Sequence, residues 1–201
     1  MNTIYSRYSR MIAVLLILLL AGCSGTSAGT TDAQSPAELH VAAAASLRFA
    51  FEDLGEQFGK AHGVNVIFQF GSSGNLAGQI AGGAPVDLFA SANRAFIDQL
   101  VDSGDIPADT VTLYATGRIV LAVNRSSGLT LNSLEDLLDD RITVIALAHP
   151  DHAPYGLAGR QALETQGLWE PLAGRLGYGE SVSQAMEYVR TGNAQAGSIA
   201  R

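Results

Sequence analysis

The chain of 201 residues has a single cysteine and no run of basic residues, and each scarcity excludes a class of protein. One cysteine cannot form a disulfide within the chain. The 12 basic side chains are scattered and outnumbered by 19 acidic ones, which gives a net charge of −7. Because nucleic-acid binding depends on clustered positive charge, we expect no nucleic-acid partner. Hydrophobic residues make up 47% of the chain, which predicts a folded protein.

The N-terminus has the layout of a bacterial secretion signal. Arg7 and Arg10 precede an apolar run, Met11–Ala21, that is shorter than the roughly 20 residues a membrane-spanning helix needs. The following LAGC resembles the lipobox of bacterial lipoproteins, in which the cysteine, here Cys23, receives a lipid. We therefore expect a lipoprotein signal peptide at residues 1–22 and a periplasmic or other extracytoplasmic protein, anchored to the membrane by lipid. An ordinary cleaved signal with a chance cysteine is the alternative.

Residues 23–37 contain no large apolar side chain and are predicted to form a flexible tether. From residue 38 the sequence alternates between strand and helix patterns, which predicts an α/β fold with a parallel sheet flanked by helices. This part, residues 38–115, is the first predicted lobe. Its predicted strands are 39–45, 64–70 and 85–92, and its predicted helices are 47–62, 76–81 and 95–101. The first helix presents an apolar stripe of Leu47, Phe51, Leu54 and Phe58.

A change of pattern marks the start of a second predicted lobe, residues 116–201. Residues 112–123 form a β-rich run without a helix behind it, which indicates a crossing between lobes. The alternation then resumes with predicted helices at 134–138, 157–166 and 182–189 and a predicted strand at 142–146. The chain stops at GSIAR without a finishing helix, so we expect that a C-terminal part is missing.

Two corners between a strand and a helix carry serine and no charge. Ser46 follows HVAAAA, and Ser73 lies within GSSGN, Gly71–Asn75. The first N–H groups of a helix lack partners inside the helix, and the helix dipole adds partial positive charge there, so neutral groups can hold an oxyanion. A serine hydroxyl can also donate to an anion. The alternative is that each serine only caps its own helix.

Five segments together resemble the molybdate-binding protein of bacterial ABC importers. The resemblance covers about Leu39–Gly197, with the segments in the order and spacing of that family. They are AAAASL, FGSSGNLAGQI, GAPVDLFASA, HPDHAPYG and ESVSQAMEYVRTGNAQAG. The resemblance implies a two-lobed periplasmic binding protein fold of type II, in which each lobe is a mostly parallel sheet flanked by helices.

The resemblance also implies a function and a site. It implies capture of molybdate, and also tungstate, between the lobes without chemical change, so we expect a binding protein that is not an enzyme and has no cofactor. Ser46 and Ser73 would bind the oxyanion through hydroxyls, and Tyr155 and Val182 through backbone N–H groups. The implied partners are the membrane permease and the ATPase of an ABC importer, and we expect a monomer.

One ligand of the family has no counterpart in this chain. The family commonly contributes a tyrosine hydroxyl from the segment that corresponds to GSIAR, and Ala200 stands at that position. Tyr155 and Tyr178 are the candidates for a replacement hydroxyl.

Three other functions compete with molybdate capture. The same fold could bind another oxyanion such as sulfate or phosphate, or serve as the effector domain of a regulator. A metal-dependent hydrolase would use His149 and His152 as metal ligands and Ser73 as nucleophile. The sequence has no GxSxG elbow, and the interpretation of HPDH as a solvated loop is favoured over a metal site.

Overall fold

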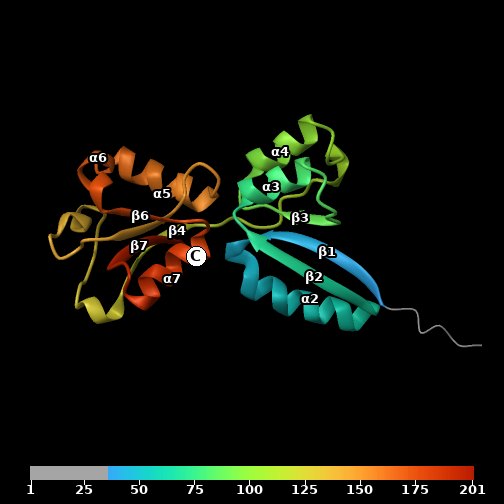
Figure 1. Cartoon of the computed structure of the whole chain (residues 1–201), viewed down its shortest axis with the longest axis horizontal. Helices are drawn as coiled ribbons and strands as arrows, with labels where there is room; N and C mark the ends of the chain where they lie inside the picture. The colour runs from blue at the N-terminus through green and yellow to red at the C-terminus, as the bar shows by residue number, and fades with distance from the viewer. Residues whose placement is uncertain (1–35) are drawn as a thin grey trace, which may run out of the picture. The chain divides into compact units, whose positions relative to one another are not determined.

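The computed structural model describes residues 36–201, whose strands form two sheets (Figure 1). The predicted signal peptide, Cys23 and the tether up to Ser35 lie outside the described residues. Within residues 36–201 no helix combines the length and the apolar character that a membrane crossing requires.

The first sheet has three parallel strands in the order β2-β1-β3. They are β1 (Ala37–Ala44), β2 (Val64–Gly71) and β3 (Leu88–Ala90). The central strand β1 pairs with both neighbours, so that Val41 lies opposite Phe68 on one side and Leu88 on the other. Small residues suit β1 because helices cover both faces of its carboxyl half, where all residues are buried. The parallel sheet predicted for this part is confirmed.

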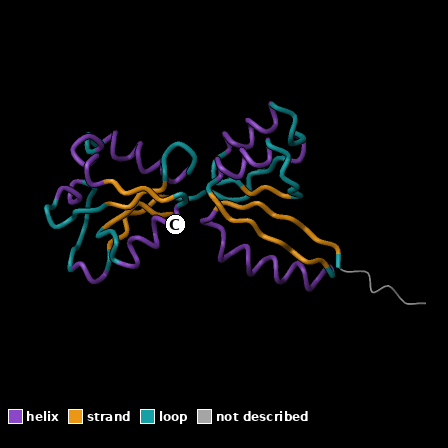
Figure 2. Tube along the Cα trace, viewed as in Figure 1, coloured by secondary structure: helices purple, strands orange, loops and turns teal. Residues whose placement is uncertain are grey.

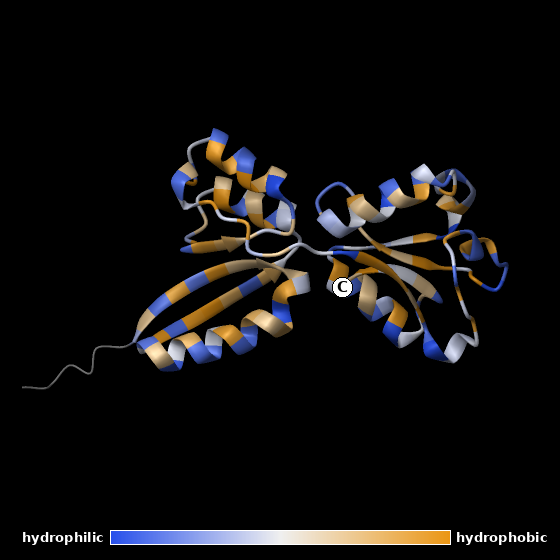
Figure 3. Cartoon of the chain, turned by 180° about the vertical axis from the view of Figure 1, so that it is seen from behind, coloured by the Kyte–Doolittle hydropathy of each residue, from blue (hydrophilic) through white to orange (hydrophobic). Residues whose placement is uncertain are grey.

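Three helices follow the three strands, as predicted. They are α2 (Arg48–His62), α3 (Ser73–Ala81) and α4 (Arg94–Asp102), with a 3-10 turn η1 (Ala45–Leu47) before α2. The predicted apolar stripe of α2 is wrong in part, because Leu54 and Phe58 are 57% and 45% exposed. The helix approaches β2 through Gly55, where an added Cβ would lie 2.4 Å from the Phe68 ring. Figure 3 shows apolar and polar residues alternating along α2.

The segment that connects the two sheets contains less strand than predicted. Residues 111–118, which follow the 3-10 turn η2 (Ala108–Thr110), have no regular structure, and only β4 (Ile119–Val123) is a strand. Residues of this stretch instead contact other segments of the chain. The Tyr114 hydroxyl donates to the Ser91 carbonyl oxygen at 2.8 Å, and Gly117 packs directly against the hydroxyl of Tyr155.

The second sheet has four strands in the order β4-β7-β5-β6. The other three strands are β5 (Ile145–Ala148), β6 (Leu176–Gly179) and β7 (Ala196–Ala200). Strand β5 is parallel to both β6 and β7, whereas β4 is antiparallel to β7. The prediction missed β6 and β7, since LGYG and AGSIA are too short and too rich in glycine and small residues to show a strand pattern. It also placed β5 three residues too early, because the buried Ile142 precedes the strand.

Helices cover both faces of the second sheet (Figures 1 and 2). The elements are α5 (Pro154–Thr165), α6 (Trp169–Leu172) and α7 (Val182–Thr191), with 3-10 turns η3 (Arg125–Ser127), η4 (Glu135–Leu138) and η5 (Ala173–Arg175). Alternate residues of β5 face the two layers. Ile145 and Leu147 pack in one cluster with Leu163 of α5, and Ala146 packs in another with Val189 of α7. Helix α5 follows β5 and α7 follows β6, and these two strands are parallel. Both helices therefore begin at the carboxyl edge of the sheet.

Candidate functional site

The two serine corners predicted from the sequence lie at the carboxyl ends of β1 and β2. Ser46 is the central residue of η1, and Ser73 is the first residue of α3, whose N-cap is Ser72. The N-caps of η1, α2 and α3 are Ala44, Leu47 and Ser72, and none of the three elements has a hydrogen bond from a capping side chain. The interpretation of Ser46 and Ser73 as helix caps is therefore wrong.

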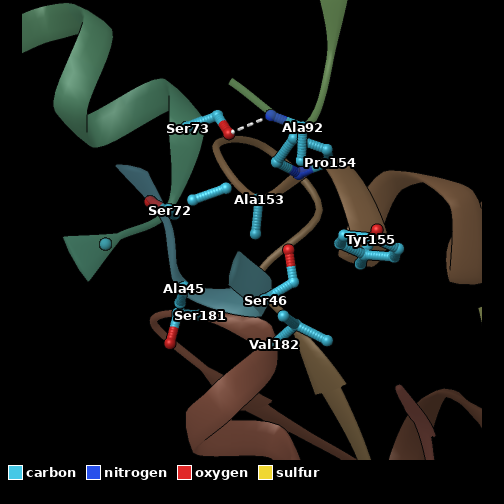
Figure 4. A pocket seen from close by; sticks show the side chains of 12 residues that line it. Ala45, Ser46, Ser72, Ser73, Ala92, Ala153, Pro154, Tyr155, Ser181 and Val182 are labelled. Atoms are coloured by element: carbon cyan, nitrogen blue, oxygen red, sulfur yellow. Dashed lines mark hydrogen bonds between the residues drawn. The ribbon is translucent and has the colours of Figure 1, made fainter. Parts of the chain in front are cut away.

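Ser73 is fully buried and its hydroxyl is oriented by the backbone. The N–H of Ala92 donates to Ser73 Oγ at 3.0 Å, as the dashed line in Figure 4 shows. A serine hydroxyl has one proton and can accept through its lone pairs. Because the Ala92 N–H already uses one lone pair, the Ser73 proton remains available to donate to a ligand.

Two helix N-termini of the second sheet face these serines. Helix α5 has Ala153 as N-cap and Pro154 as first residue, so Tyr155 provides its first N–H. Helix α7 has Ser181 as N-cap, whose side chain accepts from Gln184 N at 3.4 Å, and Val182 as first residue. First-turn N–H groups have no acceptor within the helix. Both helix dipoles therefore add partial positive charge to the place where these groups point.

All four residues predicted to bind an oxyanion line one cavity (Figure 4). Its volume is about 10 Å³, counted as the space open to the centre of a water molecule. This enclosed space is of the order of one compact ion, and the cavity is partly open to solvent. No lining residue is charged. They are Ala44, Ala45, Ser46, Gly71, Ser72, Ser73, Ala92, Ala153, Pro154, Tyr155, Ser181 and Val182.

Several residues of this cavity were not predicted. Ser72 and Ser181 bring further hydroxyls, and Ala92 brings the N–H that orients Ser73. Ser181 had a detectable signal, since serine directly before a helical pattern is a common N-cap. The contact between Ala92 and Ser73 had no such signal, because it joins the loop after β3 to the start of α3, 19 residues away in the sequence.

The side chains of both tyrosine candidates pack against residues that do not line the cavity. The Tyr155 hydroxyl oxygen lies against Gly117, 2.1 Å from the position that an added Cβ would take. Tyr178 is not a lining residue, and its ring packs 5.3 Å from that of His149. Burial raises the pKa of Tyr178. Ala200 packs beside Ala153 and Val182, next to the cavity wall.

The two histidines of HPDH stack on each other but do not form a metal centre with other ligands. Their ring centroids are 4.9 Å apart. Among residues 36–201 no group of three or more His, Cys, Asp or Glu side chains is arranged to hold a metal ion. The interpretation of HPDH as a solvated loop is nevertheless wrong for His152, whose side chain is only 22% exposed. His152 Nδ1 lies 2.9 Å from the hydroxyl of Ser72, so the serine that contacts it is not Ser73.

Comparison with known proteins matches residues 39–201 to the family described as bacterial extracellular solute-binding protein. The putative ABC transporter substrate-binding lipoprotein YvgL of Bacillus subtilis is 36% identical over 97% of this chain and 75% of its own length. The molybdate-binding protein ModA of Escherichia coli is 36% identical over 81% of this chain and 65% of its own. The chain thus spans about two-thirds to three-quarters of these relatives.

Comparison with solved structures also identifies a molybdate-binding protein as similar to this chain. The periplasmic molybdate-binding protein of Azotobacter vinelandii superposes with a TM-score of 0.76 at 35% identity, covering 81% of this chain and 71% of that one. The sulfate-binding protein SubI of Mycobacterium tuberculosis, at 19% identity and a TM-score of 0.67, shares the fold. The resemblance predicted from five sequence segments and the predicted fold class are both confirmed.

Proposed function

Because the chain belongs to the family of bacterial extracellular solute-binding proteins, we propose that it captures molybdate, and also tungstate, for an ABC importer. The names of the relatives support molybdate and the transporter. The observation that carries the proposal is the small uncharged cavity at which Ser46, Ser73 and the first turns of α5 and α7 meet. We propose that two lobes, residues 38–115 and 116–201, hold the ion between them and present it to the membrane permease and its ATPase.

The cavity suits a dianion although the whole protein is acidic. Surface charges are screened within about 8 Å at physiological salt, whereas hydroxyl and N–H donors at the cavity act at contact distance. Capture of this kind requires no chemical step, which agrees with a family that binds solutes.

The cavity also favours anions that carry no proton. Molybdate and sulfate only accept hydrogen bonds at neutral pH, whereas phosphate carries a proton that needs an acceptor. No carboxylate lines the cavity to accept that proton, and the helix N-termini offer only donors. We propose that the size of the cavity, once the lobes enclose the ion, separates molybdate from the smaller sulfate.

Calorimetric titration of the chain from Ser24 with molybdate, tungstate, sulfate and phosphate tests the proposal. We expect tight binding of the first two anions only. Ser73→Ala removes a hydrogen bond to a charged ligand, worth roughly 1.5–3 kcal/mol, and should weaken binding tenfold to hundredfold. Preferential binding of sulfate would keep the oxyanion site and overturn the choice of anion. Absence of heat with all four anions would overturn the function.

A second variant in the same titration tests a backbone donor. Val182→Pro deletes the first N–H of α7, and proline is well tolerated at that position because its fixed φ suits the first turn. The preceding Ser181 has φ −145° and ψ 166°, which a following proline permits. Binding should weaken about tenfold or more while the far-UV circular dichroism stays that of the parent. Unchanged affinity would remove Val182 from the site.

We also propose that Cys23 is lipidated and anchors the protein outside the cytoplasm. The name of the YvgL relative, a lipoprotein, supports this. Bacteria that produce the full chain and grow with a labelled fatty acid should incorporate the label into the protein and keep it in the membrane fraction. Cys23→Ser should abolish both. Label that persists in Cys23→Ser would contradict the proposal.

A further inference from the structure

A set of polar contacts joins the corner between β2 and α3 to the segments that precede α5 and α7. Ser72 Oγ lies 2.9 Å from His152 Nδ1, and the Gly74 N–H donates to the His152 carbonyl oxygen with an N···O distance of 2.8 Å. On the other side of the imidazole, Glu180 Oε2 lies 3.7 Å from His152 Nε2 and accepts from Asn75 Nδ2 at 3.4 Å. We call these five residues the His152 clasp.

Each part of the clasp is close in sequence to a proposed anion ligand. Ser72 directly precedes Ser73, and His152 precedes the α5 N-terminus that carries the Tyr155 N–H. Glu180 lies just before Ser181, the N-cap of α7. A contact that fixes one of these segments therefore limits the movement of the donor next to it.

We propose that His152 is a positioning residue that fastens the Ser73 corner to the N-termini of α5 and α7 and so slows release of the bound anion. This inference rests on the proposed function and extends it. A single imidazole performs the task because its two nitrogens face opposite ways, one toward Ser72 and one toward Glu180.

The hydrogen-bond pattern assigns different tasks to the two adjacent serines. When the proton of a neutral imidazole is on Nε2, facing Glu180, Nδ1 accepts and the Ser72 hydroxyl donates to it. The Ser72 proton is then engaged by His152 and does not reach the anion. Ser73, whose oxygen accepts from Ala92 N, keeps its proton for the anion. GSSGN thus holds one serine for the clasp and one for the ligand.

A serine, a histidine and a glutamate in a row are also the components of a hydrolytic triad, but the surroundings favour a clasp. Ser72 is only 5% exposed, so an ester or peptide has little access to its hydroxyl. Glu180 is 75% exposed, whereas the orienting carboxylate of a triad is buried. The additional bond between Gly74 N and the His152 carbonyl serves attachment and has no part in proton transfer.

The first test needs no ligand and uses the chain from Ser24. Amide hydrogen exchange of Gly74, followed by NMR, reports the bond to the His152 carbonyl directly. In His152→Ala, Gly74 should exchange about tenfold faster, whereas Leu76, whose N–H bonds to Ser72 within the same helix, should exchange as before. His40→Ala is the matched control, because His40 also faces a glutamate, Glu38 at 3.5 Å, but makes that contact within one strand.

The second test measures the rates of molybdate binding by stopped flow. In His152→Ala, molybdate should dissociate about tenfold faster with little change in the association rate, and the melting temperature should stay near that of the parent. His152→Asn should restore most of the slow dissociation, because its amide lies where Nδ1 did and can still bond to Ser72. A purely packing role for the imidazole would not be rescued by asparagine.

The outcomes separate the clasp from the proposed function. Parental Gly74 exchange and parental molybdate dissociation in His152→Ala would overturn the clasp. Faster Gly74 exchange in a protein that binds no molybdate would support the clasp and overturn the choice of molybdate. Faster dissociation in His152→Ala, restored in His152→Asn and absent in His40→Ala, would support both.

Discussion

Gly156→Ala is expected to lower the free energy of unfolding by about 3 kcal/mol, at the upper end of the range for overpacked sites. Gly156 is buried in the first turn of α5, where the helix meets the end of β5. An added Cβ would lie 2.1 Å from the Ala148 carbonyl oxygen and 2.6 Å from its carbon. Both atoms belong to the backbone of β5, a strand in which every residue is buried. No side-chain movement can therefore relieve the collision.

Urea unfolding followed by circular dichroism measures this effect, and Gly78→Ala is its matched control. Gly78 lies inside α3, and an added Cβ there would meet nothing within 4 Å. Alanine at such a site reduces the freedom of the unfolded chain and should be neutral or stabilise by up to about 1 kcal/mol. Equal unfolding midpoints for the two variants would show that α5 can shift away from β5 without loss of stability, which would contradict the prediction.

The contrast between these two glycines shows what the sequence could and could not reveal. Both glycines occur in segments that carried the resemblance to the family, and sequence pattern treats them alike. Only the structure shows that one of them touches the backbone of a strand from a different element. Close approach of backbone depends on tertiary packing, which local propensity does not contain.

Prediction of secondary structure succeeded where burial is uniform and failed where it is mixed. HVAAAA was correctly predicted as a strand of a parallel sheet, because a strand covered on both faces is apolar throughout. The apolar stripe of α2 was wrong at Leu54 and Phe58, since the helix approaches β2 through a glycine. The 3.6-residue period indicates a helix face, but it does not indicate how closely that face packs.

The residues of the candidate site were also predicted only in part. The corner argument found Ser46 and Ser73, and the resemblance added Tyr155 and Val182; the structure brings all four to one cavity. Their role as ligands stays a prediction. The task of His152 was hidden, because its partner Ser72 is 80 positions away and its sequence neighbours indicated an exposed loop. Contacts between distant loops are the part of a site that sequence pattern cannot show.

Gly74→Ala is expected to weaken molybdate binding by a hundredfold or more in a chain that stays folded. An added Cβ would lie 2.7 Å from the His152 carbonyl oxygen and 2.9 Å from its Cα. The collision is with backbone, but it lies between two segments that join different sheets, so separating them relieves it. Separation breaks the hydrogen bonds from Gly74, Ser72 and Asn75, and three bonds at about 1 kcal/mol each correspond to about 150-fold in affinity.

The comparison with Gly78→Ala makes this expectation specific, since both substitutions place alanine in the same helix. Calorimetry should find parental molybdate affinity in Gly78→Ala and a large loss in Gly74→Ala, while circular dichroism without urea shows that both variants are folded. A Gly74→Ala protein that is unfolded without urea would indicate a collision that separation does not relieve. Parental affinity in Gly74→Ala would mean that the anion is bound without the contact between Gly74 and His152. The proposed link between this contact and the position of the anion ligands would then be wrong.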